Sequence, residues 1–207
     1  EGGGNAITEA LRSLSLLWRN GQFGHFVLTR ALLVSAAFAI PYIVVLIQRE
    51  GDAELTSLGS LLLASGLAGL LAGRVWGRWS DAASHRVMAA ASVMSTLVML
   101  MALGVYYWAP TALAWPWVAG LLLFLSAVAH HGARVGRKTY LVDMADQDNR
   151  AQLTAVSNTV MGIILLAGIL LGWLDAAYGA AAVLWFLVAV GVLAFLSALA
   201  LPNVSGD

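Results

Sequence analysis

The chain has 207 residues, of which 60% are hydrophobic and 11% are charged, and its formal net charge is zero. Soluble domains carry about 25% charged residues, so this composition excludes an ordinary water-soluble domain and predicts an integral membrane protein. The zero net charge argues against a nucleic-acid binder, and the absence of cysteine excludes disulfides and thiolate metal sites, so neither a metal nor a cofactor is expected.

Residues 1–22 are expected to form a linker followed by an amphipathic helix. The opening EGGGN is typical of a flexible linker. Four apolar residues then recur on one helical face, namely Ile7, Leu11, Leu14 and Trp18. This pattern predicts a helix lying on the cytoplasmic surface of the membrane. A partner-binding helix is the alternative.

Six apolar segments follow, each near the length of about 20 residues that a helix needs to cross a bilayer. We expect spans at about 23–47, 55–75, 87–108, 117–141, 153–174 and 178–201. The predicted fold class is therefore an all-α membrane protein. Its six-helix transmembrane bundle occupies residues 23–201, and a cytoplasmic tail follows at 202–207.

Basic residues mark the connection before the first span and the connections after the second and fourth spans. These residues are Arg12, Arg19, Arg74, Arg78, Arg86, Arg134, Arg137, Lys138 and Arg150. The other connections hold one cation, Arg49. Because short basic loops stay in the cytoplasm, we expect both termini to be cytoplasmic, in a multi-pass protein of the bacterial inner membrane.

The first span carries Arg30 two turns inside its start, with Pro41 and Tyr42 further on. Arg30 either snorkels to the cytoplasmic headgroups or points into an internal cavity; the sequence leaves both open. Pro41 removes one backbone hydrogen bond and should bend the helix.

Small residues form a ladder on the second span, at Ser65, Gly69, Gly73 and Gly77. The fifth span repeats the device with Gly168 and Gly172. Such a seam lets another backbone approach closely. Two interpretations stay open: packing within this chain, or packing against a second six-helix unit.

The fourth span has a polar face and a small-residue face. The polar face comprises Ser126, His130, His131, Arg134, Arg137 and Lys138, and the other face comprises Ala129, Gly132 and Gly136. Ionisable groups at membrane depth must face protein or water, so the polar face predicts an aqueous cavity open to the cytoplasm. We interpret Arg137 and Lys138 as interfacial anchors, and His130, His131 and Arg134 as candidate functional residues.

The turn between the second and third spans reads GRWSDAASHR, from Gly77 to Arg86. It resembles part of the Gly-x-x-x-Asp-Arg-x-Gly-Arg-Arg signature of the major facilitator superfamily. Gly77, Asp81 and Arg86 are kept, whereas positions 82, 84 and 85 depart from the signature. Segments 16–33 and 140–162 also look like the entry into the seventh helix and the loop before the eleventh helix of such transporters.

The resemblance implies the C-terminal six-helix half of a twelve-helix transporter, or a unit that pairs with an equivalent one. The six spans would form two inverted three-helix repeats, because an odd number of spans inverts the second triplet. It also implies a cytoplasmic gate at Gly77, Arg78, Asp81 and Arg86. A comparable pair would join Asp143 to Arg150. The alternative is that these charges only order the loops.

These observations predict a transporter that moves a small solute by alternating access. The substrate path candidates are Arg30, Tyr42, His130, His131 and Arg134, and their charge points weakly to an anionic or polar solute. No enzymatic activity is expected. Two alternatives remain: a non-transporting scaffold or assembly protein, and an intramembrane enzyme using Ser65 with His130 or His131. Adjacent histidines project about 100° apart on a helix, which makes a poor metal site.

Overall fold

The computed structural model describes residues 14–51 and 58–204. Ile7 and Leu11 of the expected surface helix, the start of the second expected span at 55–57, and the last three tail residues lie outside the described residues. The part of the surface helix that is described forms α2, Leu16–Arg19.

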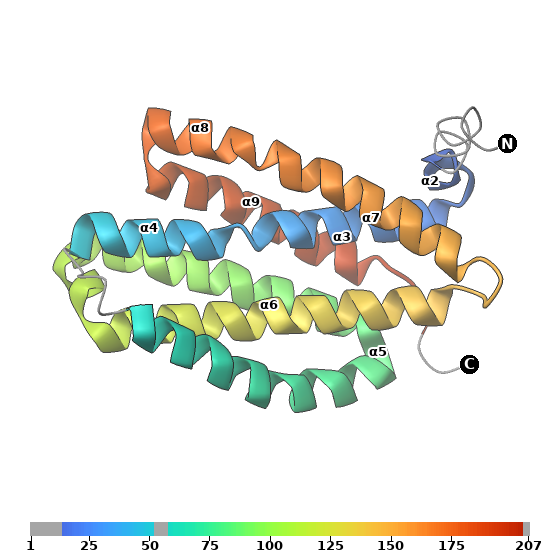
Figure 1. The fold of residues 1–207 in the computed structure, drawn as a ribbon, viewed down its shortest axis with the longest axis horizontal. Coiled ribbons are helices and arrows are strands. Elements are labelled where there is room, and N and C mark those ends of the chain that lie inside the picture. The colour runs from blue at the N-terminus through green and yellow to red at the C-terminus, as the bar shows by residue number, and fades with distance from the viewer. Residues whose placement is uncertain (1–13, 52–57, 205–207) are drawn as a thin grey trace, which may run out of the picture.

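The described residues form helices and contain no β-strand, which confirms the predicted all-α class (Figure 1). After α2 the elements are α3 (Gly21–Ala36), α4 (Ala39–Gly51), α5 (Leu58–Trp108), the short 3-10 helix η2 (Pro110–Ala114), α6 (Pro116–Met144), α7 (Arg150–Ala167), α8 (Ile169–Tyr178) and α9 (Ala180–Leu199). α6 and α9 agree with the expected fourth and sixth spans to within three residues at each end.

Five helical segments are long and apolar enough to cross a membrane: Gly21–Arg49, Gly66–Trp108, Pro116–Met144, Arg150–Tyr178 and Ala180–Leu199. The chain is therefore consistent with a multi-pass integral membrane protein. Large apolar side chains also cover much of the surface. On α7 and α8, Leu166, Ile169 and Trp173 are each at least 70% exposed, and lipid or another protein must cover such side chains.

Three of these segments are interrupted, and two of the interruptions lie close together. α3 gives way to α4 because Pro41 has no N–H to donate to the carbonyl of Ala37, and the backbone tightens: the N–H of Phe38 donates to the carbonyl of Ser35 at 3.1 Å. The bend predicted from Pro41 is thus present. α7 gives way to α8 at Gly168, and a Cβ added there would lie 2.6 Å from Cζ of Phe38. The two interruptions therefore face each other.

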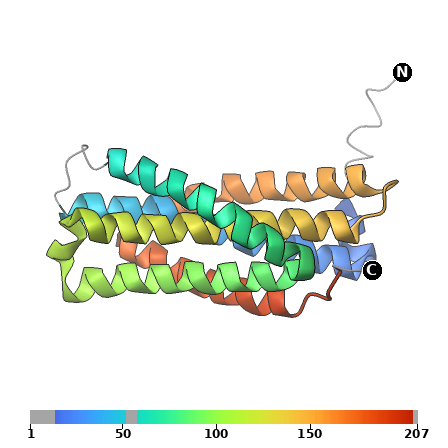
Figure 2. The ribbon, with the colours of Figure 1, turned by 90° about the horizontal axis from the view of Figure 1, so that it is seen from below.

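α5 is broken at Ala83, whose backbone angles of φ −160° and ψ 76° are not helical. The break divides α5 into a first arm, 58–82, and a second arm, 84–108, which run in opposite directions (Figure 2). The sequence predicted a loop of about ten residues here. The helices instead continue up to the break, because this segment is packed against the bundle: Ser80 and Ser84 are fully buried.

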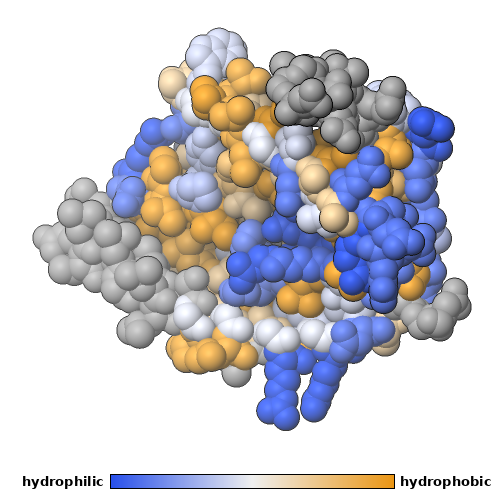
Figure 3. Space-filling view, turned by 45° about the vertical axis from the view of Figure 1, so that its right-hand side comes forward, coloured by the Kyte–Doolittle hydropathy of each residue, from blue (hydrophilic) through white to orange (hydrophobic). Residues whose placement is uncertain are grey.

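The connections lie at two ends of the bundle (Figure 1). The start of α3, the break in α5 and the α6–α7 connection share one end, which we call the basic end because Arg78, Arg86, Lys138 and Arg150 are exposed there. In Figure 3 the molecule is turned so that this end comes forward, and hydrophilic residues gather on the face in view. The opposite end holds the α4–α5, α5–α6 and α8–α9 connections.

Exposed aromatic side chains gather at the opposite end. They are Tyr107, Trp108, Trp115, Trp117 and Tyr178. Tryptophan and tyrosine are enriched where a membrane meets water, because their rings are apolar and carry one polar group. Their position therefore fits a boundary between lipid and water at this end of the helices.

α6 lies between the two arms of α5, and small residues allow the contact. A Cβ added at Gly132 would lie 2.7 Å from Cε2 of Trp76 on the first arm, and one at Gly136 would lie 2.9 Å from Cγ of Met88 on the second. The Trp76 indole N–H also donates to the carbonyl of Val128 at 3.0 Å. These approaches fix the rotation of α6, and with it the direction of its polar face.

Candidate functional site

A groove of about 390 Å³ opens between α3, α6 and α7. Its polar lining residues are Arg30 from α3 and His130 and Arg137 from α6, and its apolar walls are Val34, Ala37, Phe38, Met161 and Leu165. The groove lies beside the two helix interruptions, since Phe38 lines it. We call it the cationic groove, because its lining contains two arginines, and none of these lining residues is acidic.

Arg30 is fixed by two neutral partners on α7. Its Nη1 donates to Oγ of Ser157 at 2.6 Å, and its Nη2 donates to Oδ1 of Asn158 at 2.7 Å. Its Nε is buried and has no hydrogen-bond partner within the described residues. Arg30 therefore does not snorkel freely to the headgroups. It is a half-buried cation whose positive charge is not neutralised by the residues that hold it.

Arg137 brings a second guanidinium to the same groove. Both Arg30 and Arg134 repel its positive charge, and it forms no ion pair with any residue in the described ranges. We interpreted Arg137 from the sequence as an interfacial anchor. The structure places it half-buried in the groove lining, which also contains Arg30. An anchoring role for Arg137 stays a prediction.

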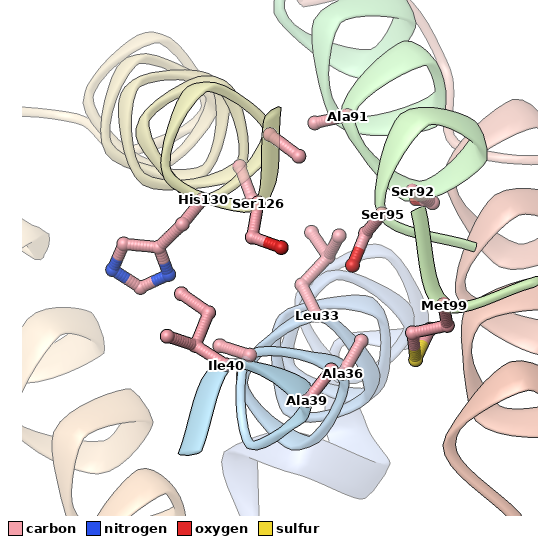
Figure 4. Close-up of a pocket in the computed structure, with 13 residues that line it drawn as sticks. Leu33, Ala36, Ala39, Ile40, Ala91, Ser92, Ser95, Met99, Ser126 and His130 are labelled. Atoms are coloured by element: carbon pink, nitrogen blue, oxygen red, sulfur yellow. The ribbon is translucent and has the colours of Figure 1, made fainter. Parts of the chain in front are cut away.

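His130 lies at the centre of α6, 14 residues from each end of the helix. It lines the cationic groove and also a second, smaller pocket of about 20 Å³, which has room for roughly one water molecule. Figure 4 shows the hydroxyls of Ser95 and Ser126 directed into the small pocket, with the His130 imidazole pointing away from them. His130 therefore separates the small pocket from the groove.

The other predicted path residues lie elsewhere. His131 points to the first arm of α5, where a Cβ added at Gly69 would lie 3.2 Å from its Nε2. Arg134 is exposed, with Nη2 3.5 Å from Nδ1 of His131. Tyr42 is on α4, near the carboxylate of Asp175 towards the opposite end. Of the five candidates, Arg30 and His130 alone line the cationic groove.

The predicted gate residues lie at the basic end, on both sides of the α5 break. Gly77, Arg78 and Asp81 belong to the first arm and Arg86 to the second. Among the described residues, no hydrogen bond or ion pair joins Asp81 to either arginine. In the α6–α7 connection, Arg150 donates to the carbonyl of Val142 at 3.1 Å. A gating role for these residues and for Asp143 stays a prediction.

The predicted small-residue seam meets few neighbours among the described residues. Within that part of the chain, a Cβ added at Gly73, Gly77 or Gly172 would have no atom within 4 Å other than those of its own helix turn. Gly69 and Gly168 contact His131 and Phe38. The side chain of Ser65 lies outside the described residues. Packing against a second unit therefore stays open for the outward-facing glycines.

An ion pair at the opposite end was missed by the sequence analysis. Arg49 at the end of α4 donates two hydrogen bonds to the carboxylate of Asp175 on α8, at 2.8 and 2.9 Å. Arg30 and Arg49 thus join the same two helical segments, Arg30 about two turns from the basic end and Arg49 at the opposite end. Arg49 meets a carboxylate there, whereas Arg30 meets a hydroxyl and an amide.

Ser157 and Asn158 were also missed, although the sequence held a signal. They stand in the run SNT within an otherwise apolar segment of α7. Polar residues inside a membrane span are rare and often functional. A search for such runs would have selected this position, although it could not have identified Arg30, more than a hundred residues earlier, as its partner.

Comparison with models of known protein families, with curated proteins and with solved structures finds no match to this chain. The resemblance to the major facilitator superfamily thus stays an expectation, based on the motif around Asp81 and on segments 16–33 and 140–162.

Proposed function

We propose that this chain is one half of a membrane transporter that moves a small solute by alternating access. The fold proposed for it is six spans in two inverted three-helix repeats, of the major facilitator type. Five apolar segments support this, together with the break at Ala83, because each arm of α5 has about 25 residues. A helix of that length rises about 37 Å, more than the roughly 30 Å of a bilayer core.

The observation that carries the proposal is the cationic groove, which extends from His130 at mid-span towards the basic end. Arg30 lies nine residues after the start of α3, and Arg137 lies seven residues before the end of α6. Charged groups at that depth are tolerated where they face water or protein. The groove is open on one side, which leaves room for a second six-helix unit to complete an enclosed path. The basic end lies in the cytoplasm in this proposal, because basic connections are retained there.

The interruptions at Phe38 and Gly168 support a moving part beside the groove. Transporter helices are commonly discontinuous at the substrate site, because broken helices free backbone groups and bend at low cost. In this chain both broken segments, α3–α4 and α7–α8, flank the groove.

Labelling of single cysteines tests the orientation, because the chain has no cysteine of its own. Thr111→Cys in η2 and Asn149→Cys in the α6–α7 connection should react with a membrane-impermeant maleimide from opposite sides of the membrane. Reaction of both from the same side would exclude six crossings.

Reconstitution into proteoliposomes tests transport. The polypeptide that contains this chain should move labelled small solutes faster than protein-free vesicles do. Val34→Cys in the groove should react with an impermeant maleimide from an aqueous side, whereas Leu32→Cys, on the same helix but outside the groove lining, should react at least about tenfold more slowly. A folded protein that moves no solute, and whose Val34→Cys reacts from neither side, would favour the scaffold alternative and overturn the proposal.

A further inference from the structure

The two guanidiniums of the cationic groove leave a positive charge that no residue in 14–51 or 58–204 neutralises. Arg30 and Arg137 line the same space, and none of the described lining residues is acidic. The groups that hold Arg30 are a hydroxyl and an amide, and its buried Nε is unpartnered in the described ranges. Two like charges in a partly dehydrated site destabilise each other. Such a site gains stability when an anion enters it.

The geometry of the lining favours an oxyanion. A guanidinium presents a planar set of N–H donors that matches the paired oxygens of a carboxylate or phosphate. Ser157 and Asn158 use the two terminal nitrogens of Arg30 as anchors, which fixes its plane. No hydrogen bond anchors Arg137 in the described part of the chain, so its N–H donors are not committed to a protein acceptor there. His130 adds a third nitrogen-bearing group to the lining.

The apolar part of the lining fits a small organic body. Val34, Phe38 and Met161 form walls, and ligand sites commonly combine apolar walls with a few converging polar groups. The volume of about 390 Å³ accommodates a small organic acid or phosphate ester. The 20 Å³ pocket behind His130 holds no more than water.

We infer that the cationic groove binds the oxyanion of a small free solute, a carboxylate or a phosphate, between Arg30 and Arg137. This inference rests on the proposed transport function, of which it names the substrate class. Ser157 and Asn158 are positioning residues, because they act through Arg30. The same chemistry is available from a lipid headgroup phosphate or from a carboxylate of an accompanying domain, and the experiment separates these sources.

Protection of Val34→Cys from alkylation measures occupancy directly. The full polypeptide, delipidated in a phosphate-free maltoside detergent, is mixed with inorganic phosphate, with acetate or with succinate, against chloride at equal ionic strength. At least one oxyanion should slow alkylation severalfold and saturably. Arg30→Gln and Arg137→Gln should each weaken that protection by about tenfold or more, because each removes a charged hydrogen-bond donor. Lys138→Gln, an equal charge change at the exposed neighbouring position, should leave it unchanged.

Three results would overturn the inference. The first is that no oxyanion slows alkylation in the parent Val34→Cys protein. This result does not depend on whether the arginine variants fold. The second is protection by added phosphatidylglycerol alone, which assigns the charge to lipid. The third is that the arginine variants lose association with the accompanying domain while free anions have no effect. Solute flux without protection by anions would support transport and contradict this substrate class. Protection by anions without solute flux would support the anion site and contradict transport.

Discussion

The two faces of α6 differ in how closely their neighbours approach. On one face, Gly132 and Gly136 receive side chains from both arms of α5. On the other, His130 and Arg137 border an open groove of about 390 Å³. Close packing on the first face fixes the rotation of the helix, and this rotation directs His130 and Arg137 on the second face towards the groove. The first face should therefore determine stability, and the second should determine ligand chemistry.

The largest effect is expected from Gly132→Leu. A Cβ at this position would lie 2.7 Å from the Trp76 ring, which is itself buried. The larger side chain would force the first arm of α5 away from α6, at a cost of about 3 kcal/mol or more. We expect loss of the monodisperse protein in detergent, or a large fall in its thermal unfolding midpoint.

Gly120→Leu is the matched control on the same helix. Among the described residues, a Cβ at Gly120 meets no atom within 4 Å beyond its own helix turn, so this variant should unfold near the wild-type temperature. Equal midpoints for the two variants would show that the glycine face of α6 is not closely packed.

A smaller loss is expected from Trp76→Phe. The change removes the indole N–H that donates to the carbonyl of Val128 at 3.0 Å, and such a bond contributes about 1 kcal/mol. Trp79→Phe is the comparison, because Trp79 stacks on Trp76 at 5.6 Å but is 42% exposed. Denaturant unfolding in micelles should show the larger loss at position 76. The reverse order would contradict a structural role for the Val128 contact.

Much of this fold could be predicted from the sequence, because bilayer length and helix periodicity constrain it strongly. The bend at Pro41 and the two-sided character of α6 were predicted. Of the six apolar spans predicted, the structure has five segments long enough to cross a membrane, because residues 66–108 count as one segment. The α5 turn was predicted at the correct place but too long. Polarity identifies a connection, whereas burial of Ser80 and Ser84, which depends on tertiary packing, decides how far the helices continue into it.

The pairings across the bundle could not be predicted. α9 is apolar on all sides, and hydropathy does not separate the side that faces α3 and the second arm of α5 from the side that faces outward; the structure buries Leu187 and exposes Leu193. Arg30 with Ser157, and Arg49 with Asp175, are separated by 127 and 126 residues. No local pattern links residues so far apart.

The Arg49–Asp175 pair differs from the groove arginines, because the chain supplies the counter-charge of Arg49. A double-mutant cycle with Arg49→Gln and Asp175→Asn should give a coupling energy of about 1 kcal/mol or less, since Arg49 is 52% exposed. The measurement is the free energy of unfolding of the four proteins. A coupling several times larger would show that the pair is shielded from water.

The smallest change in stability, and one of opposite sign, is expected from Arg137→Gln on the groove face. Removing this charge relieves its repulsion by Arg30 and Arg134, so the free energy of unfolding should stay within about 0.5 kcal/mol of the wild-type value or rise slightly. Any rise should shrink with added salt, which screens the repulsion. Lys138→Gln, at an exposed position, should show a weaker dependence on salt. A loss above about 1 kcal/mol would mean that Arg137 makes a stabilising contact, and the groove face would then share the structural role assigned to the glycine face.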